Sequence, residues 1–299
     1  MFEVSVPATT GNLGPGFDCL GAALSLYNKF QFAVSDELKI TASGAGADKV
    51  AKNKSNLVYE SLEKFYAHIG QPKPIISLHI DAQVPLARGL GSSATAIVGG
   101  LVGANLLAGS PLEQKDLLQL AIDMEGHPDN VVPAMLGGCY LMASNKSGGW
   151  EFCPINWHKQ VAIAIAIPNF ELSTAKARQV LPRDVPMKDA IFNASHLALL
   201  THALTTGNQD WLQSGLQDRL HQPYRQSLIP GMEAVQKAAI EAGAYGMVIS
   251  GAGPTLLALG SPAKIEAVAE AMRAAWQETG MISTAKCLAI AKHGTTFTG

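Results

Sequence analysis

The sequence has little charge and no long apolar run. Charged residues make up 15% of its 299 residues, and 22 basic against 24 acidic side chains leave a net charge of −2. Proteins that bind nucleic acid normally carry a basic patch or stripe, so this composition argues against such a partner. No window approaches the roughly 20 apolar residues that span a bilayer, and the N-terminus does not resemble a signal peptide. We therefore expect a cytoplasmic protein that binds neither nucleic acid nor a membrane.

Cysteine is also scarce. The four cysteines, Cys19, Cys139, Cys153 and Cys287, are widely separated, and no two of them have the spacing of a metal site. Reduced thiols are the simplest interpretation. Hydrophobic residues, in contrast, make up 47% of the chain, and its 29 glycines occur in clusters. Clustered glycines indicate places where the backbone turns sharply or approaches a ligand closely.

The first half of the chain reads as strands and glycine turns followed by helices. A helix is predicted over 55–69, with Gly70 as its stop, and a buried helix over 92–108, where small apolar residues continue without a charge. Ser110 is predicted to cap the next helix, with Pro111 at its first position and Glu113 completing a capping box.

The second half begins after a segment rich in Gly, Ser and Trp at residues 145–158. It reads as a strand (161–167), several helices (174–242), two strands (245–249 and 255–259), a helix (263–279) and a last strand near 286–290. This order suggests a split βαβ arrangement in an α+β sandwich.

The run Pro85-Leu-Ala-Arg-Gly-Leu-Gly-Ser-Ser-Ala-Thr95 lies between a predicted strand and the buried helix. Gly89 and Gly91 can adopt positive φ angles, so that successive N–H groups converge on one anion. The helix that follows directs its free N–H groups to the same point. The run lacks the Gly-Lys-Ser/Thr ending of a Walker A loop and the GxGxxG of a dinucleotide site. By itself it is either a phosphate site or a tight turn into a helix.

Four other segments carry polar groups that suit a nucleotide or a zwitterion. Glu125-Gly-His-Pro-Asp-Asn130 offers carboxylates for magnesium, although it also reads as a polar turn. Asn12 and Asp18 lie among glycines, where an Asp can bind an ammonium group or cap a turn. Thr174 and Arg178 share a helical face, and an arginine such as Arg178 or Arg225 can bind a carboxylate through two hydrogen bonds. Ser250-Gly-Ala-Gly-Pro-Thr255 reads equally as a wall of the site or as a hairpin.

Three of these segments, in this order, resemble the motifs of the GHMP kinase superfamily: Pro7 to Asp18, Pro85 to Thr95 and Ser250 to Thr255. Within it, Pro-Ala-Thr-Thr-Gly-Asn-Leu-Gly-Pro-Gly-Phe-Asp resembles the first motif of the homoserine kinases. Glu-Gly-His-Pro-Asp-Asn-Val-Val-Pro-Ala, Ser-Thr-Ala-Lys-Ala-Arg and Gln-Pro-Tyr-Arg agree with the same enzymes. The resemblance implies an α+β, two-domain GHMP kinase fold. Residues 1–155 would form a ribosomal protein S5 domain 2-like ATP-binding domain, and residues 156–299 a ferredoxin-like domain.

The resemblance also implies an activity and a set of site residues. The activity is transfer of the ATP γ-phosphate to the side-chain hydroxyl of L-homoserine in threonine biosynthesis, with Mg²⁺, by a homodimer. ATP would contact Asn56 and the loop Pro85, Leu86, Ala87, Arg88, Gly89, Leu90, Gly91, Ser92, Ser93, Ala94 and Thr95, and magnesium would be held by Ser93 and Glu125. The amino acid would be surrounded by Asn12, Asp18, His127, Asp129, Arg178 and Arg225, the arginines binding its carboxylate.

The catalytic residues implied are Asn130, Thr174, Ser93 and Glu125. Asn130 occupies the place of the aspartate base of many GHMP kinases, and an amide can orient a hydroxyl but cannot take its proton. We therefore expect Asn130 and Thr174 to orient the acceptor, with Asp129 as the alternative, a true base. Two other functions stay open: a GHMP-type kinase of another small alcohol, and a nucleotide-binding regulator without catalysis.

Overall fold

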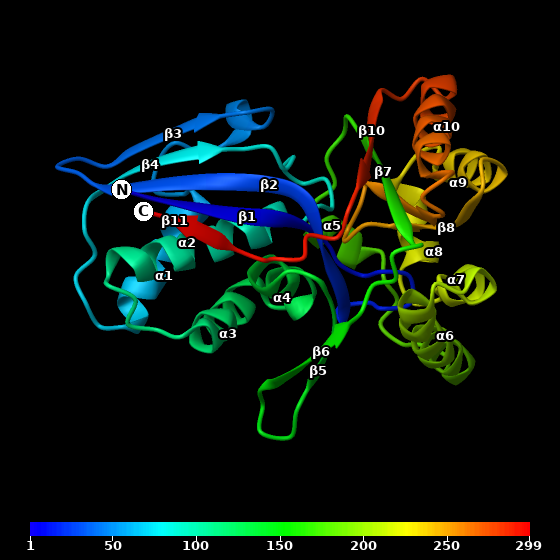
Figure 1. Cartoon of the computed structure of the whole chain (residues 1–299), viewed down its shortest axis with the longest axis horizontal. Coiled ribbons are helices and arrows are strands. Elements are labelled where there is room, and N and C mark those ends of the chain that lie inside the picture. The colour runs from blue at the N-terminus through cyan, green and yellow to red at the C-terminus, as the bar shows by residue number, and fades with distance from the viewer.

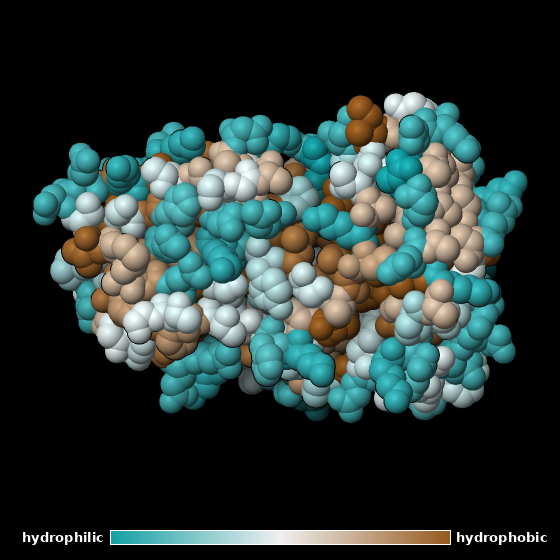
Figure 2. Space-filling model, turned by 45° about the horizontal axis from the view of Figure 1, so that its top comes forward, coloured by the Kyte–Doolittle hydropathy of each residue, from teal (hydrophilic) through white to brown (hydrophobic).

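The computed structural model describes residues 1–299 and contains two β-sheets, each packed against helices. Figure 1 shows a larger sheet with α1 to α4 beside it and a smaller sheet surrounded by α5 to α10. In the face drawn in Figure 2, hydrophilic residues dominate the periphery, and hydrophobic ones gather toward the junction of the two parts. None of the helices combines the length and the apolar character that a bilayer span requires.

The larger sheet has seven strands in the order β11-β1-β2-β4-β3, with β5 paired to β2 and β6 to β5. The β3–β4 pair is parallel, and all other pairs are antiparallel. The strands are β1 (Phe2–Thr10), β2 (Leu20–Val34), β3 (Lys39–Ser43), β4 (Ile76–Asp81), β5 (Cys139–Ser144), β6 (Trp150–Ile155) and β11 (Thr296–Thr298).

The helices of this part are α1 (Leu57–His68), α2 (Ser92–Leu107), α3 (Gln114–Glu125) and α4 (Pro128–Leu136), with a 3₁₀ turn at Ala47–Lys49. Helix α2 is the buried helix that the sequence predicts. Its glycines let the sheet come close: a Cβ at Gly99 would lie 2.5 Å from the ring of Phe30, and one at Gly103 would lie 2.3 Å from that of Phe32. This packing fixes where α2 begins, and that start lies at the site described below.

The smaller sheet is antiparallel, in the order β10-β7-β9-β8. Its strands are β7 (Ala162–Pro168), β8 (Ala244–Ile249), β9 (Leu256–Gly260) and β10 (Ser283–Leu288). Its helices are α5 (Thr174–Gln179), α6 (Met187–Thr206), α7 (Gln209–Gly215), α8 (Gln222–Arg225), α9 (Met232–Glu241) and α10 (Ile265–Glu278), with a 3₁₀ turn at Gln226–Leu228.

A single apolar cluster joins the two parts. It combines Leu13 and Leu20 of the first part with Ile163 and Leu257 of the smaller sheet, and with Leu204 of α6. These side chains are at most 1% exposed. Because this cluster is shared, the glycine-rich turn between β1 and β2 is fixed against the second part of the chain.

Two details of the chain differ from the sequence analysis. The capping box predicted at Ser110 is wrong: α3 begins at Gln114, with Glu113 as its N-cap. Ser110 has a φ of 61° and donates its N–H to the Asn105 carbonyl, while the Asn105 side chain bonds to Leu112. These bonds close the end of α2 and keep residues 110–112 out of the next helix.

The second difference is at the C-terminus. The predicted last strand near 286–290 corresponds to β10, but the chain continues and returns to the first part. There β11 pairs with β1, so that Val4 lies opposite Phe297. The predicted domain boundary at 155 falls between β6 and β7, which belong to different sheets, yet the larger sheet also contains residues 296–298.

Candidate active site

A cavity of about 290 Å³ lies between the two parts of the molecule. It is bordered by the start of α2, the end of α3, the start of α5 and the turns at 11–18 and 250–255. Most of the residues that border it are polar or glycine. Twelve of them are among the site residues predicted from the sequence: Asn12, Ala87, Gly89, Gly91, Ser92, Ser93, Glu125, His127, Asn130, Thr174, Arg178 and Arg225.

The loop before α2 is held from both sides by backbone bonds. Thr9 donates its N–H to the Leu90 carbonyl over 3.1 Å, and Thr255 donates to the Arg88 carbonyl over 3.2 Å. Gly91 has a φ of 67° and caps α2, and a Cβ there would lie 1.9 Å from the Thr9 hydroxyl oxygen. No side chain caps this helix, so its first N–H groups remain free at the cavity. Free N–H groups at a helix N-terminus bind anions.

Ser93 and Glu125 face each other at this helix start. The Ser93 hydroxyl donates to Glu125 Oε2 over 2.7 Å. Burial raises the pKa of Glu125, the Ser93 hydrogen bond and His127 oppose that rise, and Asp129 adds to it. A carboxylate and a hydroxyl beside a phosphate site are hard oxygen donors of the type that magnesium prefers. The residues present therefore fit a magnesium ion.

The segment after α3 contributes a pair of acidic and basic groups and an amide. His127 Nδ1 lies 2.7 Å from Asp129 Oδ1, while Asp129 is fully buried and its Oδ2 has no hydrogen-bond partner. Burial pulls the pKa of His127 down, but the hydrogen bond to Asp129 and the nearby carboxylates raise it above its ordinary value. Asn130 Oδ1 accepts a hydrogen bond of 2.9 Å from the Thr9 hydroxyl. His127 and Asn130 border the cavity, whereas Asp129 does not.

Arg178 lies opposite this segment and is paired with Asp18. Its two terminal nitrogens contact the two carboxylate oxygens over 3.0 and 2.7 Å, and this pairing raises the pKa of Arg178. Asp18 has a φ of 55°, and its N–H donates to Asn12 Oδ1, with Asn12 at a φ of 56°. A two-pronged contact of this kind is the geometry in which arginine binds a carboxylate.

Arg225 is the second arginine and is only 1% exposed. Its Nε donates to the Ala177 carbonyl over 3.2 Å, and its Nη1 donates to the Gly251 carbonyl over 3.1 Å. Burial, with a contribution from Arg178, lowers its pKa to about 10. The guanidinium therefore stays protonated at neutral pH, and its Nη2 has no hydrogen-bond partner in the protein.

The other predicted site residues lie outside this cavity. Arg88 turns away from it and donates to the carbonyls of Pro168 and Asn169, each over 3.0 Å. Asn56 caps α1 through Val58, and it borders a second, mostly apolar pocket of about 250 Å³ that reaches Ser92 and Ser93. Of the remaining loop residues, Leu86 borders that second pocket, and Pro85, Leu90, Ala94 and Thr95 border neither.

Several residues that shape the cavity are not among the site residues predicted from the sequence. The Ser250 hydroxyl donates to the Gly89 carbonyl over 2.6 Å, and Gly251 borders the cavity, so the turn at 250–255 joins the antiparallel strands β8 and β9 and also forms a wall of the site. Thr9 holds Asn130, and the ring of Phe17 lies 5.4 Å from the Arg178 guanidinium and 5.1 Å from that of Arg225. These contacts join residues far apart in the chain, and no local pattern marks them.

Comparison with known proteins agrees with the fold. Two family models match, the GHMP kinases N terminal domain over residues 56–138 and the GHMP kinases C terminal domain over 200–278. A homoserine kinase from a Synechococcus species is 58% identical, with 98% of this chain and 96% of the relative covered. One from Trichormus variabilis is 57% identical over 98% and 97% of the two chains.

Solved structures agree as well. The homoserine kinase of Cytophaga hutchinsonii aligns with a TM-score of 0.88 at 28% identity, covering 99% of this chain and 97% of that one. A mevalonate kinase from L. major aligns with a TM-score of 0.74 at 16% identity, covering 97% and 96%, which shows a shared fold. The chain belongs to the GHMP kinase family, and the predicted two-domain fold is confirmed. Within that family it belongs with the homoserine kinases.

Proposed function

We propose that the chain transfers the γ-phosphoryl group of ATP to the side-chain hydroxyl of L-homoserine, giving O-phospho-L-homoserine for threonine biosynthesis. The observation that carries this proposal is the pairing of two anion sites in one cavity. The start of α2 offers free N–H groups, and Arg178 and Arg225 offer guanidinium groups beside it. The first suits a phosphate chain, and the second suits the carboxylate of an amino acid.

The nucleotide would extend from the start of α2 into the neighbouring pocket. That pocket meets the phosphate site at Ser92 and Ser93, and its walls include Phe30, Val58 and Ile80. Apolar walls with a few polar groups are typical of sites for planar rings. We assign the adenine to this pocket, with Asn56 at its edge, and the triphosphate to the loop of residues 85–95.

Magnesium would be held by Ser93 and Glu125. When bound, the ion neutralises charge on the phosphates during transfer. The Ser93–Glu125 contact of 2.7 Å already holds the two oxygen donors together. Burial raises the pKa of Glu125, and a bound divalent ion would favour the ionised carboxylate that burial disfavours.

The amino acid would lie between the glycine-rich turn and the two arginines. Its carboxylate would bind Arg178 and Arg225, and an acidic side chain, Asp18 or Asp129, would face its ammonium group. Asp18 takes one N–H group from each terminal nitrogen of Arg178, so the carboxylate would bind the second N–H groups of these nitrogens or take the place of Asp18. Asn12 and His127 would complete the pocket.

Asn130 and Thr174 would orient the acceptor hydroxyl without a strong base. Transfer through a loose transition state depends mainly on position and on neutralising charge. Asp129 fits the alternative role of base less well, because its carboxylate is fully buried and, unlike its partner His127, it does not border the cavity. If Asn130→Asp keeps or raises kcat while Asp129→Asn leaves kcat untouched, these roles need to be reassigned.

The test of the proposed function is ADP release from ATP and Mg²⁺ with a panel of alcohols. Homoserine should give the highest kcat/KM among homoserine, mevalonate, galactose and shikimate, and ³¹P NMR should detect a phosphate ester of the side chain. A higher value with another alcohol would support a different GHMP-type kinase. Tight ATP binding without turnover on any alcohol would support a regulator. Light scattering would test the homodimer that we propose from the family resemblance.

A further inference from the structure

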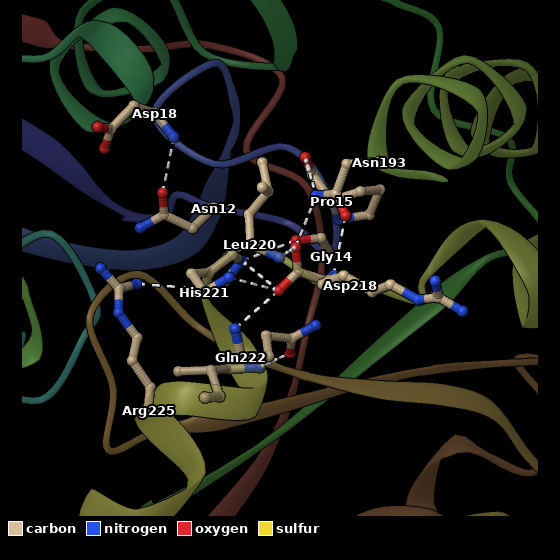
Figure 3. Close-up of polar contacts among 12 residues, drawn as sticks. Asn12, Gly14, Pro15, Asp18, Asn193, Asp218, Leu220, His221, Gln222 and Arg225 are labelled. Atoms are coloured by element: carbon tan, nitrogen blue, oxygen red, sulfur yellow. Dashed lines mark hydrogen bonds and ion pairs between the residues drawn. The ribbon is translucent and has the colours of Figure 1, made fainter. Parts of the chain in front are cut away.

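His221 is a buried histidine that lies behind the arginine site and does not border the cavity. Figure 3 places it between Gly14 of the glycine-rich turn and Arg225 at the end of α8. Its Nε2 lies 2.8 Å from the Gly14 carbonyl oxygen, and its Nδ1 lies 3.3 Å from Arg225 Nη1. Its ring also stacks on Phe17, with centroids 5.3 Å apart.

The two ring contacts require the same protonation state. A carbonyl oxygen only accepts, so Nε2 must carry the proton that it donates to Gly14. A guanidinium nitrogen only donates, so Nδ1 must be the unprotonated acceptor for Arg225. The geometry therefore defines a neutral imidazole with its proton on Nε2. The ring joins an acceptor in the first part of the chain to a donor in the second.

Asp218 fixes the backbone that carries this histidine. Its side chain is fully buried and accepts the N–H groups of Leu220, His221 and Gln222 over 2.9, 2.9 and 2.7 Å. The amide of Asn193 on α6 adds a fourth hydrogen bond of 2.7 Å. Figure 3 shows these bonds converging on one carboxylate. The start of α8 is thus held rigidly, and His221 has little freedom to turn.

The contacts of Arg225 show what this rigidity does. The Ala177 carbonyl accepts a hydrogen bond from Nε, and the Gly251 carbonyl and His221 Nδ1 each accept one from Nη1. Three separate segments therefore set the plane of the guanidinium. Only Nη2 remains for a ligand. We propose that His221 is a positioning residue for substrate binding: it orients Arg225 relative to the turn that carries Asn12 and Asp18, and so favours alcohols that bear a carboxylate. This rests on the proposed function, in which Arg225 binds the carboxylate of homoserine.

The test compares homoserine with aminopropanol, which is homoserine without its carboxylate. The variant His221→Phe keeps a flat ring against Phe17 but removes both hydrogen bonds. We expect the KM for homoserine to rise about tenfold, the loss of one well-placed hydrogen bond. The KM for ATP and the inhibition constant of aminopropanol should not change. An unchanged homoserine KM, or an equal loss for both compounds, would overturn the proposal, because a general structural defect weakens both.

Two further variants separate the two contacts. In the variant His221→Asn, the side-chain Oδ1 can accept the hydrogen bond from Arg225. In the variant His221→Gln, the side-chain amide can donate a hydrogen bond to the Gly14 carbonyl. Asn should restore more homoserine affinity than Gln, and equal KM values in the two variants would overturn the proposal even if the Phe variant failed to fold.

Arg225→Gln distinguishes this proposal from the proposed function. If Arg225→Gln keeps the wild-type preference for homoserine over aminopropanol, then the assignment of the carboxylate is wrong. If that variant loses the preference while His221→Phe keeps it, only the role of His221 is wrong.

Discussion

The cavity contains two anion-binding regions that are built in different ways. At the start of α2 the groups that face the cavity are main-chain N–H groups, and glycines allow the backbone to adopt its path. At the arginine site the groups are side chains, held by the carbonyls of Ala177 and Gly251 and by Asp18. A backbone site is damaged by adding an atom, and a side-chain site by removing one. The two regions therefore respond to mutation in opposite ways.

The largest effect is expected from Gly91→Ala. Its φ of 67° strains any side chain, and its Cβ would lie 1.9 Å from the Thr9 hydroxyl oxygen. Moving Thr9 or the loop turns N–H groups away from the phosphates, and loss of such donors lowers rates on the order of 100-fold or more. We expect a fall of that size in kcat/KM for ATP, measured by coupled ADP release.

Gly70→Ala is the matched control for that change. Gly70 has a φ of 65°, but a Cβ there would meet no atom within 4 Å. This variant should lose only about 1 kcal/mol of stability in urea unfolding, from the backbone strain alone, and should keep full activity. Similar kinetics in the two variants would show that strain, and not the site, explains the loss at Gly91.

The next effect concerns the side-chain site. Arg225→Gln removes a buried cation, and truncating a buried charged partner costs about 2 to 5 kcal/mol of binding energy. We expect the KM for homoserine to rise on the order of 100-fold, with the KM for ATP unchanged in steady-state assays. Arg273→Gln on α10, where Arg273 is paired with Glu270 at the surface, should change neither value. An equal rise in both KM values for Arg225→Gln would remove the distinction between the two regions.

A smaller effect follows from pH. Burial lowers the pKa of His221, and Arg225 lowers it further, while Asp218, the bond to Gly14 and Asp18 raise it. The folded state therefore resists a proton that the unfolded chain takes up near pH 6.5. The stability that this neutral histidine contributes is present above pH 6.5 and is lost as the pH falls below it.

Urea unfolding of the wild type and His221→Phe at several pH values tests this sign. The variant lacks two hydrogen bonds, so it should be less stable at pH 7.5 by about 1 to 2 kcal/mol. This difference in stability should become smaller as the pH falls toward 5. Only the wild type has a histidine at position 221, and the unfolded chain binds a proton there that the folded state resists. A gap that widens on acidification would show that His221 is protonated in the folded protein.

The two regions also differ in how far the sequence predicts them. Residue type alone indicates the loop before α2, because Gly89 and Gly91 permit the positive φ angles that the structure has there. The arginines give a weaker sign, because residue type shows only that they can bind a carboxylate, and the family resemblance assigned them to the substrate. Contacts such as Thr9 with Asn130, 121 residues apart, depend on tertiary packing, so no pattern of spacing could reveal them. For the same reason the sequence indicated neither His221 nor the return of β11.

The smallest effect is expected at Ser110, where a positive φ serves no ligand. If Ser110 were the N-cap of α3, replacing it would cost about 0.5 to 2 kcal/mol. In the structure it has a φ of 61° and no side-chain hydrogen bond to the helix, and Gly109 beside it also has a positive φ. Ser110→Gly should therefore raise the free energy of unfolding by up to about 1 kcal/mol, because glycine adopts this conformation without a steric penalty.

Urea unfolding measures the change, and kcat should stay at its wild-type value. A loss of stability would indicate that Ser110 does cap α3. A loss of activity would mean that the end of α2 controls its start at the cavity, so that the backbone site depends on more than its own loop.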